Sequence, residues 1–195
     1  VTVSIPVYTE ANEVIFETIR SSIAAVKKYQ EYSYQAGNVI VSDDGIAVML
    51  GGFCTEEKVE RLLERFFQDS PELSAQERKA AQRICFYREQ QVPFVVRPAK
   101  NRAGLFKKAS NLNYTLRMGE AIYQGKGRKE LTKPGAEFEY GYAEGNIYTN
   151  EMILLLDKDS GVKEKIIEAI APEFSVDDKL AYVQCATHAV NVSDN

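Results

Sequence analysis

The sequence is poor in the residues that mark disulfide-bonded, membrane-spanning or histidine-rich proteins. Its three cysteines, Cys54, Cys85 and Cys185, are widely spaced and form no C-x-x-C pair, which favours buried thiols in a reducing compartment. His188 is the single histidine, so a metal site built from several histidines is excluded and a structural role for this residue is favoured. No apolar run approaches the roughly 18 residues that cross a bilayer.

Three common nucleotide and hydrolase motifs are also missing. Gly51 and Gly52 do not extend into G-x-G-x-x-G, the spacing from Gly119 to Gly125 does not make a P-loop, and no G-x-S-x-G occurs. These absences argue against the simplest dinucleotide-binding, P-loop and α/β-hydrolase interpretations.

The composition that remains is that of a globular protein. The 195 residues are 45% hydrophobic and 27% charged, which excludes a disordered or collagen-like chain. The net charge of −4 argues against nucleic acid or an anionic membrane as the main partner. We expect a single domain over residues 1–195. The chain starts in an apolar segment rather than at a methionine, so we expect it to be part of a longer protein.

The hydrophobic pattern alternates between strands and helices. Residues 1–7 and 38–42 are β-branched runs typical of strands, and apolar residues recur every three or four positions over 13–29, as in a helix. This order predicts a βαβ unit in an α/β domain with a parallel sheet. Further strands are expected at 92–97, 152–156 (buried) and 181–184, and further helices at 55–67, 74–91, 110–123 and 162–170.

Two of these helices have clear start signals, and one later segment has no pattern. Thr55 is followed by two glutamates, which suit the positive end of a helix dipole. Ser74 and Glu77 have the spacing of a capping box. Residues 125–150 are rich in glycine and tyrosine without periodicity, so we expect an irregular functional or mobile loop there.

Polar side chains follow three of the predicted strands. Ligands of open parallel α/β sheets bind beyond the carboxyl ends of the strands, so these side chains are candidate ligands. An aspartate after a strand can also be an ordinary turn former, but two Asp-rich ends after strongly apolar strands favour a site. The candidates are Tyr8 and Glu10 after the first strand, Asp43 and Asp44 after the second, and Asp157 and Asp159 after the strand at 152–156.

The last of these pairs has the spacing of a metal site. In extended chain the side chains of Asp157 and Asp159 emerge on the same face, and adjacent carboxylates repel unless a cation joins them. Mg²⁺ is usually held by one or two carboxylates together with phosphate oxygens. The alternative is a helix start, with Asp159 or Ser160 as its cap, and the two interpretations are compatible.

A basic segment offers the matching anion site. Residues 97–108 carry five cations and precede the helix predicted from Ser110. Cations beside a helix N-terminus bind phosphate, although a solvated basic loop is an equally good interpretation of the segment alone. A nucleoside diphosphate bridged to the aspartates by a metal would explain both charge clusters.

Five segments in order resemble one enzyme family. VTVSIPVYTEANEVIFETIRSSIAA, VIVSDDG, KKASNLNYTL, LLLDKDSGV and AYVQ are similar to segments of family-2 inverting glycosyltransferases, nearest the branch of cellulose, chitin and hyaluronan synthases. The resemblance implies the GT-A fold, a Rossmann-like, mostly parallel sheet with helices on both faces. It makes residues 46–91 a helical insertion and 125–150 an inserted loop, for which we consider a role as an acceptor-side lid.

The resemblance implies a nucleoside site at the first two strands. Pro6, Tyr8 and Glu10 would lie in the loop after the first strand, beside the nucleoside. Asp43 and Asp44 stand in the D-D-G motif, and one of them would contact a uracil-type base.

It also implies a site for the diphosphate, the sugar and a metal. Lys108 would contact the diphosphate, with Asn111 and Asn113 nearby. Asp157 would face the ribose and sugar, and Asp159, together with Asp157, would bind Mn²⁺ or Mg²⁺ in a D-x-D motif.

The implied activity is transfer of a sugar from a nucleotide-diphospho-sugar, in the first instance a UDP-sugar, to a saccharide or other hydroxyl acceptor. The domain would face the cytoplasm, and its parent protein could be anchored in a membrane. Two alternatives stay open: a nucleotidyltransferase that makes nucleotide sugars, and a non-catalytic module that binds them.

The catalytic residue of the implied transfer is not identified in this sequence. The family's acidic base belongs to a T-E-D-like motif that follows the donor-binding motifs, and none follows Asp159 in this sequence. We therefore expect the base downstream of Asn195 and the acceptor region with it. This chain alone is then expected to be inactive or to hydrolyse donor slowly.

Overall fold

The computed structural model describes residues 1–99 and 107–185 and shows an α/β fold. One five-stranded sheet has the order β4-β3-β2-β1-β5. Its strands are β1 (Thr2–Val7), β2 (Asn38–Asp43), β3 (Phe94–Val96), β4 (Tyr142–Glu144) and β5 (Ile153–Leu155). All neighbouring pairs are parallel except β3 and β4. The predicted fold class, an α/β domain with a mostly parallel sheet, is thus confirmed.

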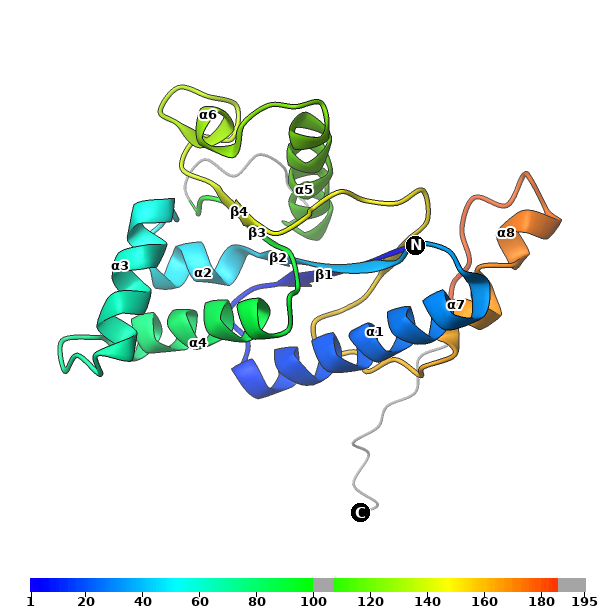
Figure 1. The fold of residues 1–195 in the computed structure, drawn as a ribbon, viewed down its shortest axis with the longest axis horizontal. Coiled ribbons are helices and arrows are strands. Elements are labelled where there is room, and N and C mark those ends of the chain that lie inside the picture. Colours follow the sequence, from blue (N-terminus) through cyan, green and yellow to red (C-terminus); the bar gives the residue numbers. More distant parts are fainter. Residues whose placement is uncertain (100–106, 186–195) are drawn as a thin grey trace, which may run out of the picture.

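Helices cover both faces of the sheet (Figure 1). The long helix α1 (Asn12–Ser33) lies beside α4 (Ala75–Glu89) on one face, and α5 (Lys107–Tyr123) lies on the other. The α1 side holds the larger core, in which Val3 and Ile5 of β1 pack with Ile15 and Ile19 of α1. Because the branched side chains of β1 and α1 are buried against each other, they stabilise the βαβ unit that the sequence predicted.

Two further helices connect β2 to α4. Helix α2 (Asp44–Met49) continues directly from β2, and α3 (Glu56–Phe67) follows. The predicted start signals are confirmed: the Thr55 side chain accepts from the backbone N–H of Lys58, and Ser74 and Glu77 form a complete capping box at the start of α4. Because these caps satisfy N–H groups that a helix leaves unpaired, they fix where α3 and α4 begin.

The segment 125–150 is irregular over most of its length, as predicted, but it is not only a loop. It contains the short helix α6 (Arg128–Thr132) and strand β4, which forms the antiparallel edge of the sheet. Its apolar residues Leu131, Phe138 and Ile147 pack with Met118 of α5 in a second, smaller core. These contacts are spaced irregularly along the chain, which is why no periodicity revealed them.

The structure also corrects the predictions for the end of the chain. Strand β5 is the other edge of the sheet, and Ile153 and Leu155 are 38% and 49% exposed, so this strand is not buried. Residues 181–184 are exposed and form no strand. The helix predicted over 162–170 is shorter, α7 (Ile166–Ile170), and is followed by α8 (Glu173–Val176). Among the described residues, no helix is long and apolar enough to cross a membrane.

Candidate functional site at the carboxyl ends of the strands

The parallel strands bring their carboxyl ends to one edge of the sheet, and the predicted polar residues gather there. Helix α5 starts at this edge because its side chains bond to the end of β2. The Asn111 amide donates to the Ser42 carbonyl (2.9 Å), and the Ser42 and Thr115 hydroxyls lie 2.8 Å apart. The first turn of α5, which carries Lys108, is thereby held over the end of the sheet.

Lys108 and Asp157 form the pair at the centre of this edge. The Lys108 ammonium lies 2.6 and 2.7 Å from the two carboxylate oxygens of Asp157. The hydrogen bond from Lys108 holds the pKa of Asp157 below its ordinary value. The side chains are 59% and 43% exposed, so a ligand can reach both. Lys108 of the predicted basic segment and Asp157 of the predicted acidic pair therefore meet in the structure.

The turn after β5 is fixed against the loop after β1. The Lys158 ammonium lies 3.6 Å from a Glu10 oxygen and 3.9 Å from an Asp159 oxygen. The hydroxyl of Thr18, from α1, donates to the Lys158 carbonyl (2.9 Å). The loop expected beside the nucleoside and the turn expected to hold the metal are thus neighbours. Lys158 was not among the predicted site residues, although it stands between the two aspartates.

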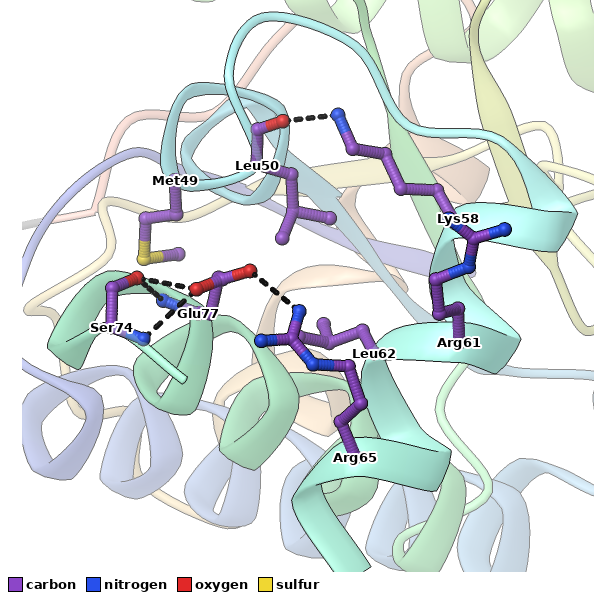
Figure 2. Close-up of a pocket in the computed structure, with 8 residues that line it drawn as sticks. All are labelled: Met49, Leu50, Lys58, Arg61, Leu62, Arg65, Ser74 and Glu77. Atoms are coloured by element: carbon purple, nitrogen blue, oxygen red, sulfur yellow. Dashed lines mark hydrogen bonds and ion pairs between the residues drawn. The ribbon is translucent and has the colours of Figure 1, made fainter. Parts of the chain in front are cut away.

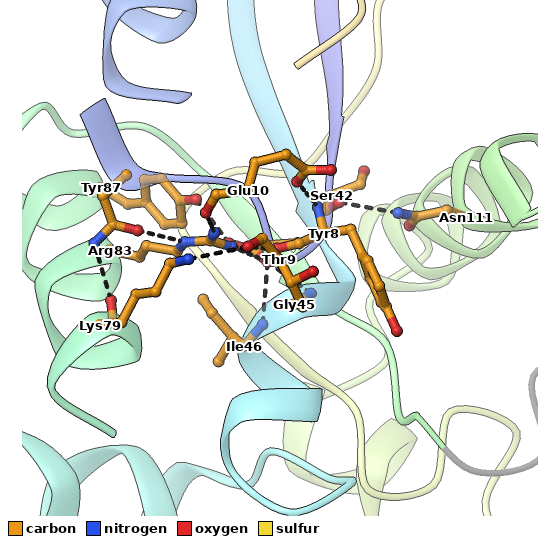
Figure 3. A network of polar contacts seen from close by, with 12 residues as sticks. Tyr8, Thr9, Glu10, Ser42, Gly45, Ile46, Lys79, Arg83, Tyr87 and Asn111 are labelled. Carbon is orange, nitrogen blue, oxygen red and sulfur yellow. Dashed lines mark hydrogen bonds and ion pairs between the residues drawn. The ribbon is translucent and has the colours of Figure 1, made fainter. Parts of the chain in front are cut away.

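The residues of the β1 loop differ from one another in exposure. Tyr8 is 39% exposed, and its ring points away from the buried polar network (Figure 3). Glu10 accepts from the Tyr8 backbone N–H (2.8 Å), which closes the loop on itself. Pro6 does not lie in this loop, because β1 continues through Val7 and Pro6 is buried inside it. Pairing of β1 with β5 ends at Ser4, two residues before Pro6. Proline has no backbone N–H to donate, and at this position β5 no longer pairs with β1, so no hydrogen bond between the strands is lost.

A fully buried arginine of α4 holds this loop in place by hydrogen bonds. Arg83 donates to the carbonyls of Tyr8 (2.5 Å) and Glu10 (2.6 Å) and to the Asn12 side chain (2.8 Å). It also lies 3.0 and 3.1 Å from the two oxygens of Asp43. Figure 3 shows these contacts converging from α4 on the β1 loop. Arg83 was not among the predicted site residues. The one feature that could have indicated it is its position between apolar residues of a predicted helix.

Asp43 is enclosed by donors. Besides Arg83, it accepts from the Tyr87 hydroxyl (2.8 Å) and from the backbone N–H groups of Gly45 (2.8 Å) and Ile46 (3.1 Å). The last two contacts cap α2. Burial raises the pKa of Asp43, and the Arg83 guanidinium opposes this shift. Its carboxylate is completely buried, so neither of its oxygens is exposed to a nucleotide base.

Asp44 is engaged in a second buried ion pair. Arg97, at the end of β3, donates to its two oxygens at 2.6 and 3.2 Å and to the Ser110 hydroxyl at 2.7 Å. Arg97 and Asp44 are only 5% and 6% exposed. Contact of Asp43 or Asp44 with a nucleotide base would therefore require displacement of an arginine. In the structure, the ion pairs of both aspartates fix the ends of the strands.

The two asparagines of α5, and Gln184 at the end of the A-Y-V-Q segment, divide between buried and exposed positions. Asn111 is buried in its bond to β2, whereas Asn113 is exposed on another face of α5, as expected for residues two apart on a helix. Gln184 is exposed and outside any strand.

Some of the sequence predictions fall on residues that the structure does not describe. His188, Lys100 and Arg102 lie outside the described residues, and so does Asn195. The catalytic base expected downstream of Asn195 therefore stays a prediction.

Asp157 and Asp159 are the carboxylates at this edge that were predicted to hold a metal ion. Among residues 1–99 and 107–185, no group of three or more His, Cys, Asp or Glu side chains could hold a metal by itself. Asp157 and Asp159 nevertheless supply the hard oxygen donors that Mg²⁺ or Mn²⁺ takes when phosphate oxygens and water complete its coordination. Two pockets, of about 280 and 300 Å³, are lined by other residues, so the candidate site rests on side-chain geometry and not on a cavity.

Comparison of the chain with protein-family models, curated proteins and solved structures finds no match.

Proposed function

We propose that this chain is the donor-binding part of a GT-A glycosyltransferase of the inverting family 2, and that it binds a UDP-sugar with Mn²⁺ or Mg²⁺. The observation that carries the proposal is the pairing of Lys108 with Asp157 across two elements distant in sequence. This pairing supports the proposal because the resemblance to this family implies that Lys108 contacts the diphosphate and that Asp157 faces the sugar, so the two side chains should lie close together.

The geometry suits a ligand that carries both negative charge and hydroxyl groups. A diphosphate would replace the Asp157 carboxylate as partner of the Lys108 ammonium, and the freed carboxylate could then accept from sugar or ribose hydroxyls. Asp159 and Asp157 would hold the metal, which would neutralise charge that develops on the departing diphosphate. The exposed ring of Tyr8 offers an apolar face for the base.

The proposal assigns no catalytic base to residues 1–195 and leaves this role to a residue downstream of Asn195. In an inverting transfer, a base removes the proton of the acceptor hydroxyl, and three carboxylates at this edge are engaged in ion pairs instead. Asp43 and Asp44 are buried in ion pairs, and Asp157 pairs with Lys108. Donor binding is therefore the property of this chain to test. A cytoplasmic location belongs to the same proposal, since nucleotide sugars are made there.

Calorimetric titration with UDP, with and without Mn²⁺, tests the proposal. We expect binding that requires Mn²⁺ and that is lost in Asp159→Ala and Lys108→Gln. Asp178→Ala and Lys27→Gln are matched controls, because each removes the same charge from an exposed position elsewhere. Metal-independent binding, or equal loss in a variant and its control, would contradict the proposal.

A further inference from the structure

The turn that carries the two candidate metal aspartates rests on helix α1. It follows β5, an edge strand of three residues, and both Asp157 and Asp159 are exposed. Within the turn, the Ser160 backbone N–H donates to the Asp157 carbonyl (3.0 Å). An exposed turn after a short edge strand is the kind of segment that opens locally at low cost, so contacts from other elements decide where its side chains lie.

Two hydroxyl groups of α1 bond to this turn at separate points. The Thr18 hydroxyl donates to the Lys158 carbonyl (2.9 Å). The Ser21 hydroxyl accepts from the Val162 backbone N–H (3.3 Å). Thr18 and Ser21 are three residues apart and are therefore neighbours on the surface of the helix. Because their partners are four residues apart in the chain, the two bonds fix the orientation of the turn as well as its distance from α1.

Thr18 departs from the usual behaviour of a hydroxyl group in a helix. Ser22 and Ser33, in the same helix, donate to the carbonyls four residues earlier, each at 2.7 Å, which is the common pattern. The Thr18 hydroxyl lies 3.3 Å from the Val14 carbonyl, but its shorter contact is the one to Lys158. Since a hydroxyl group has one proton to donate, the distances favour Lys158. Thr18 is 2% exposed, so this bond is shielded from water.

Helix α1 also begins at the loop that is proposed to contact the nucleoside. The side chain of Asn12, the first residue of α1, accepts from the buried Arg83 (2.8 Å). Arg83 also donates to the carbonyls of Tyr8 and Glu10. On the side of the turn, the Lys158 ammonium lies 3.6 Å from a Glu10 oxygen. One helix thus supports both the loop after β1 and the turn after β5, and it sets the distance between them.

We infer that Thr18 and Ser21 are positioning residues of the candidate donor site, because they hold the turn after β5 in place. This turn carries Asp159 and also Asp157, which meets Lys108. The inference rests on the proposed function, in which the turn binds the metal and faces the sugar. Neither hydroxyl contacts the ligand in this arrangement. Both act through the backbone of the turn, so their loss should weaken binding by leaving the turn less ordered.

Three variants separate positioning of the turn from general stability. Thr18→Val has a similar shape and lacks the hydroxyl, whereas Thr18→Ser keeps it. Ser21→Ala removes the acceptor of the second bond. We expect Thr18→Val to keep the Tm of the wild type within about 4 °C, because the added apolar burial offsets the lost hydrogen bond.

Hydrogen exchange of backbone amides, measured by NMR on the ligand-free chain, reports on the turn itself. The amides of Ser160 and Val162 are the probes, since both donate hydrogen bonds at the turn. We expect both to exchange about fivefold faster in Thr18→Val, as for the loss of one hydrogen bond, and at the wild-type rate in Thr18→Ser. Ser22→Ala is the matched control, because Ser22 is fully buried in the same helix but donates within it.

Calorimetry with UDP and Mn²⁺ then measures the effect on the site. The affinity should fall about two- to fivefold in Thr18→Val and about tenfold when Ser21→Ala is added, because the ligand must then order the turn. Ser74→Ala is a second control. Ser74 lines the pocket between α2, α3 and α4, where it caps α4 (Figure 2). Its loss should lower the stability of the chain but leave the affinity for UDP unchanged.

The inference is overturned if exchange at the two probe amides is unchanged in Thr18→Val, if Ser22→Ala accelerates it equally, or if Thr18→Ser does not restore it. It is also overturned if the turn loosens while the affinity for UDP stays that of the wild type, because the hydroxyls would then support the fold alone. Absence of UDP binding by the wild type would contradict the proposed function instead, and hydrogen exchange would still decide whether α1 fixes the turn.

Discussion

Replacement of Arg83 by methionine should cause the largest loss of stability among single substitutions at this edge of the sheet. Arg83 and Asp43 are both completely buried, so Arg83→Met leaves a carboxylate without its counter-ion. The same change removes the donors to the carbonyls of Tyr8 and Glu10. Methionine has a similar length and an apolar chain, so the packing of α4 against α1 and α2 is otherwise preserved.

The magnitude follows from the cost of breaking a buried ion pair. Removal of one partner typically costs about 3–5 kcal/mol, because the other charge stays buried and unpaired. For a chain of this size, that corresponds to a decrease in Tm of about 6–20 °C. The double variant Arg83→Met with Asp43→Asn should recover part of the loss, since asparagine is neutral and keeps one oxygen for the N–H groups of Gly45 and Ile46.

The loss should depend on pH in a defined direction. Burial already raises the pKa of Asp43, and removal of the opposing guanidinium raises it further. A carboxyl group with a higher pKa in the folded than in the unfolded state takes up a proton on folding, so its contribution to stability falls as the pH rises above about 3.9, the unfolded value. The deficit of Arg83→Met should therefore be larger at about pH 8 than at about pH 5.

Urea unfolding of the wild type, both single variants and the double variant at the two pH values measures these quantities. A deficit of Arg83→Met below about 1 kcal/mol would refute the reasoning, because changes of that size are ordinary for surface substitutions. A deficit that shrinks as the pH rises would refute the assignment of the buried charge to Asp43.

Four further outcomes are expected. Gly45→Ala should strongly destabilise the chain or displace the β1 loop, because a Cβ there would lie 1.8 Å from the Tyr8 carbonyl oxygen; an unchanged Tm would contradict this geometry. Asp157→Asn and Lys108→Gln should each change the free energy of unfolding by less than about 1 kcal/mol, since the pair is exposed. The small stabilisation from Asp157, whose pKa is lowered in the fold, should be present above about pH 3.9 and lost as the pH falls, and acid titration of unfolding with the asparagine variant as reference measures it. Ser74→Ala should cost about 1 kcal/mol through loss of the capping box, and an equal cost for Ser175→Ala, a control outside any cap, would argue against that cause.

The parts of the fold that the sequence predicted are those governed by local chemistry. The β1–α1–β2 unit follows from branched apolar runs and a helical stripe, and the starts of α3 and α4 follow from Thr55 and Ser74, whose side chains act within a few residues. Such signals are complete within the segment that carries them.

The predictions that failed depend on distant contacts. Strand β4 pairs with β3 and its segment packs on α5, although nothing within residues 125–150 is periodic. The strand at 152–156 was expected to be buried because its residues are apolar, but its place at the edge of the sheet leaves Ile153 and Leu155 exposed. Hydrophobicity alone does not distinguish a central strand from an edge strand.

The candidate site divides in the same way. The gathering of Glu10, Lys108 and the aspartates at 157 and 159 follows from the rule for the carboxyl ends of parallel strands, and the structure places them together. The burial of Asp43 and Asp44 was not foreseen, because their partners Arg83 and Arg97 lie 40 and 53 residues away.

The most direct test of the central proposal is to locate UDP and Mn²⁺ on the chain by paramagnetic broadening of backbone amide signals. Mn²⁺ bound with UDP broadens signals close to it. We predict that broadening appears only when UDP is present, that it is strongest at residues 157–160 and extends to residues 8–10 and 108, and that Asp159→Ala abolishes it. Broadening centred on any other part of the chain, or none at saturating UDP, would contradict the assignment of this edge as a nucleotide-sugar site.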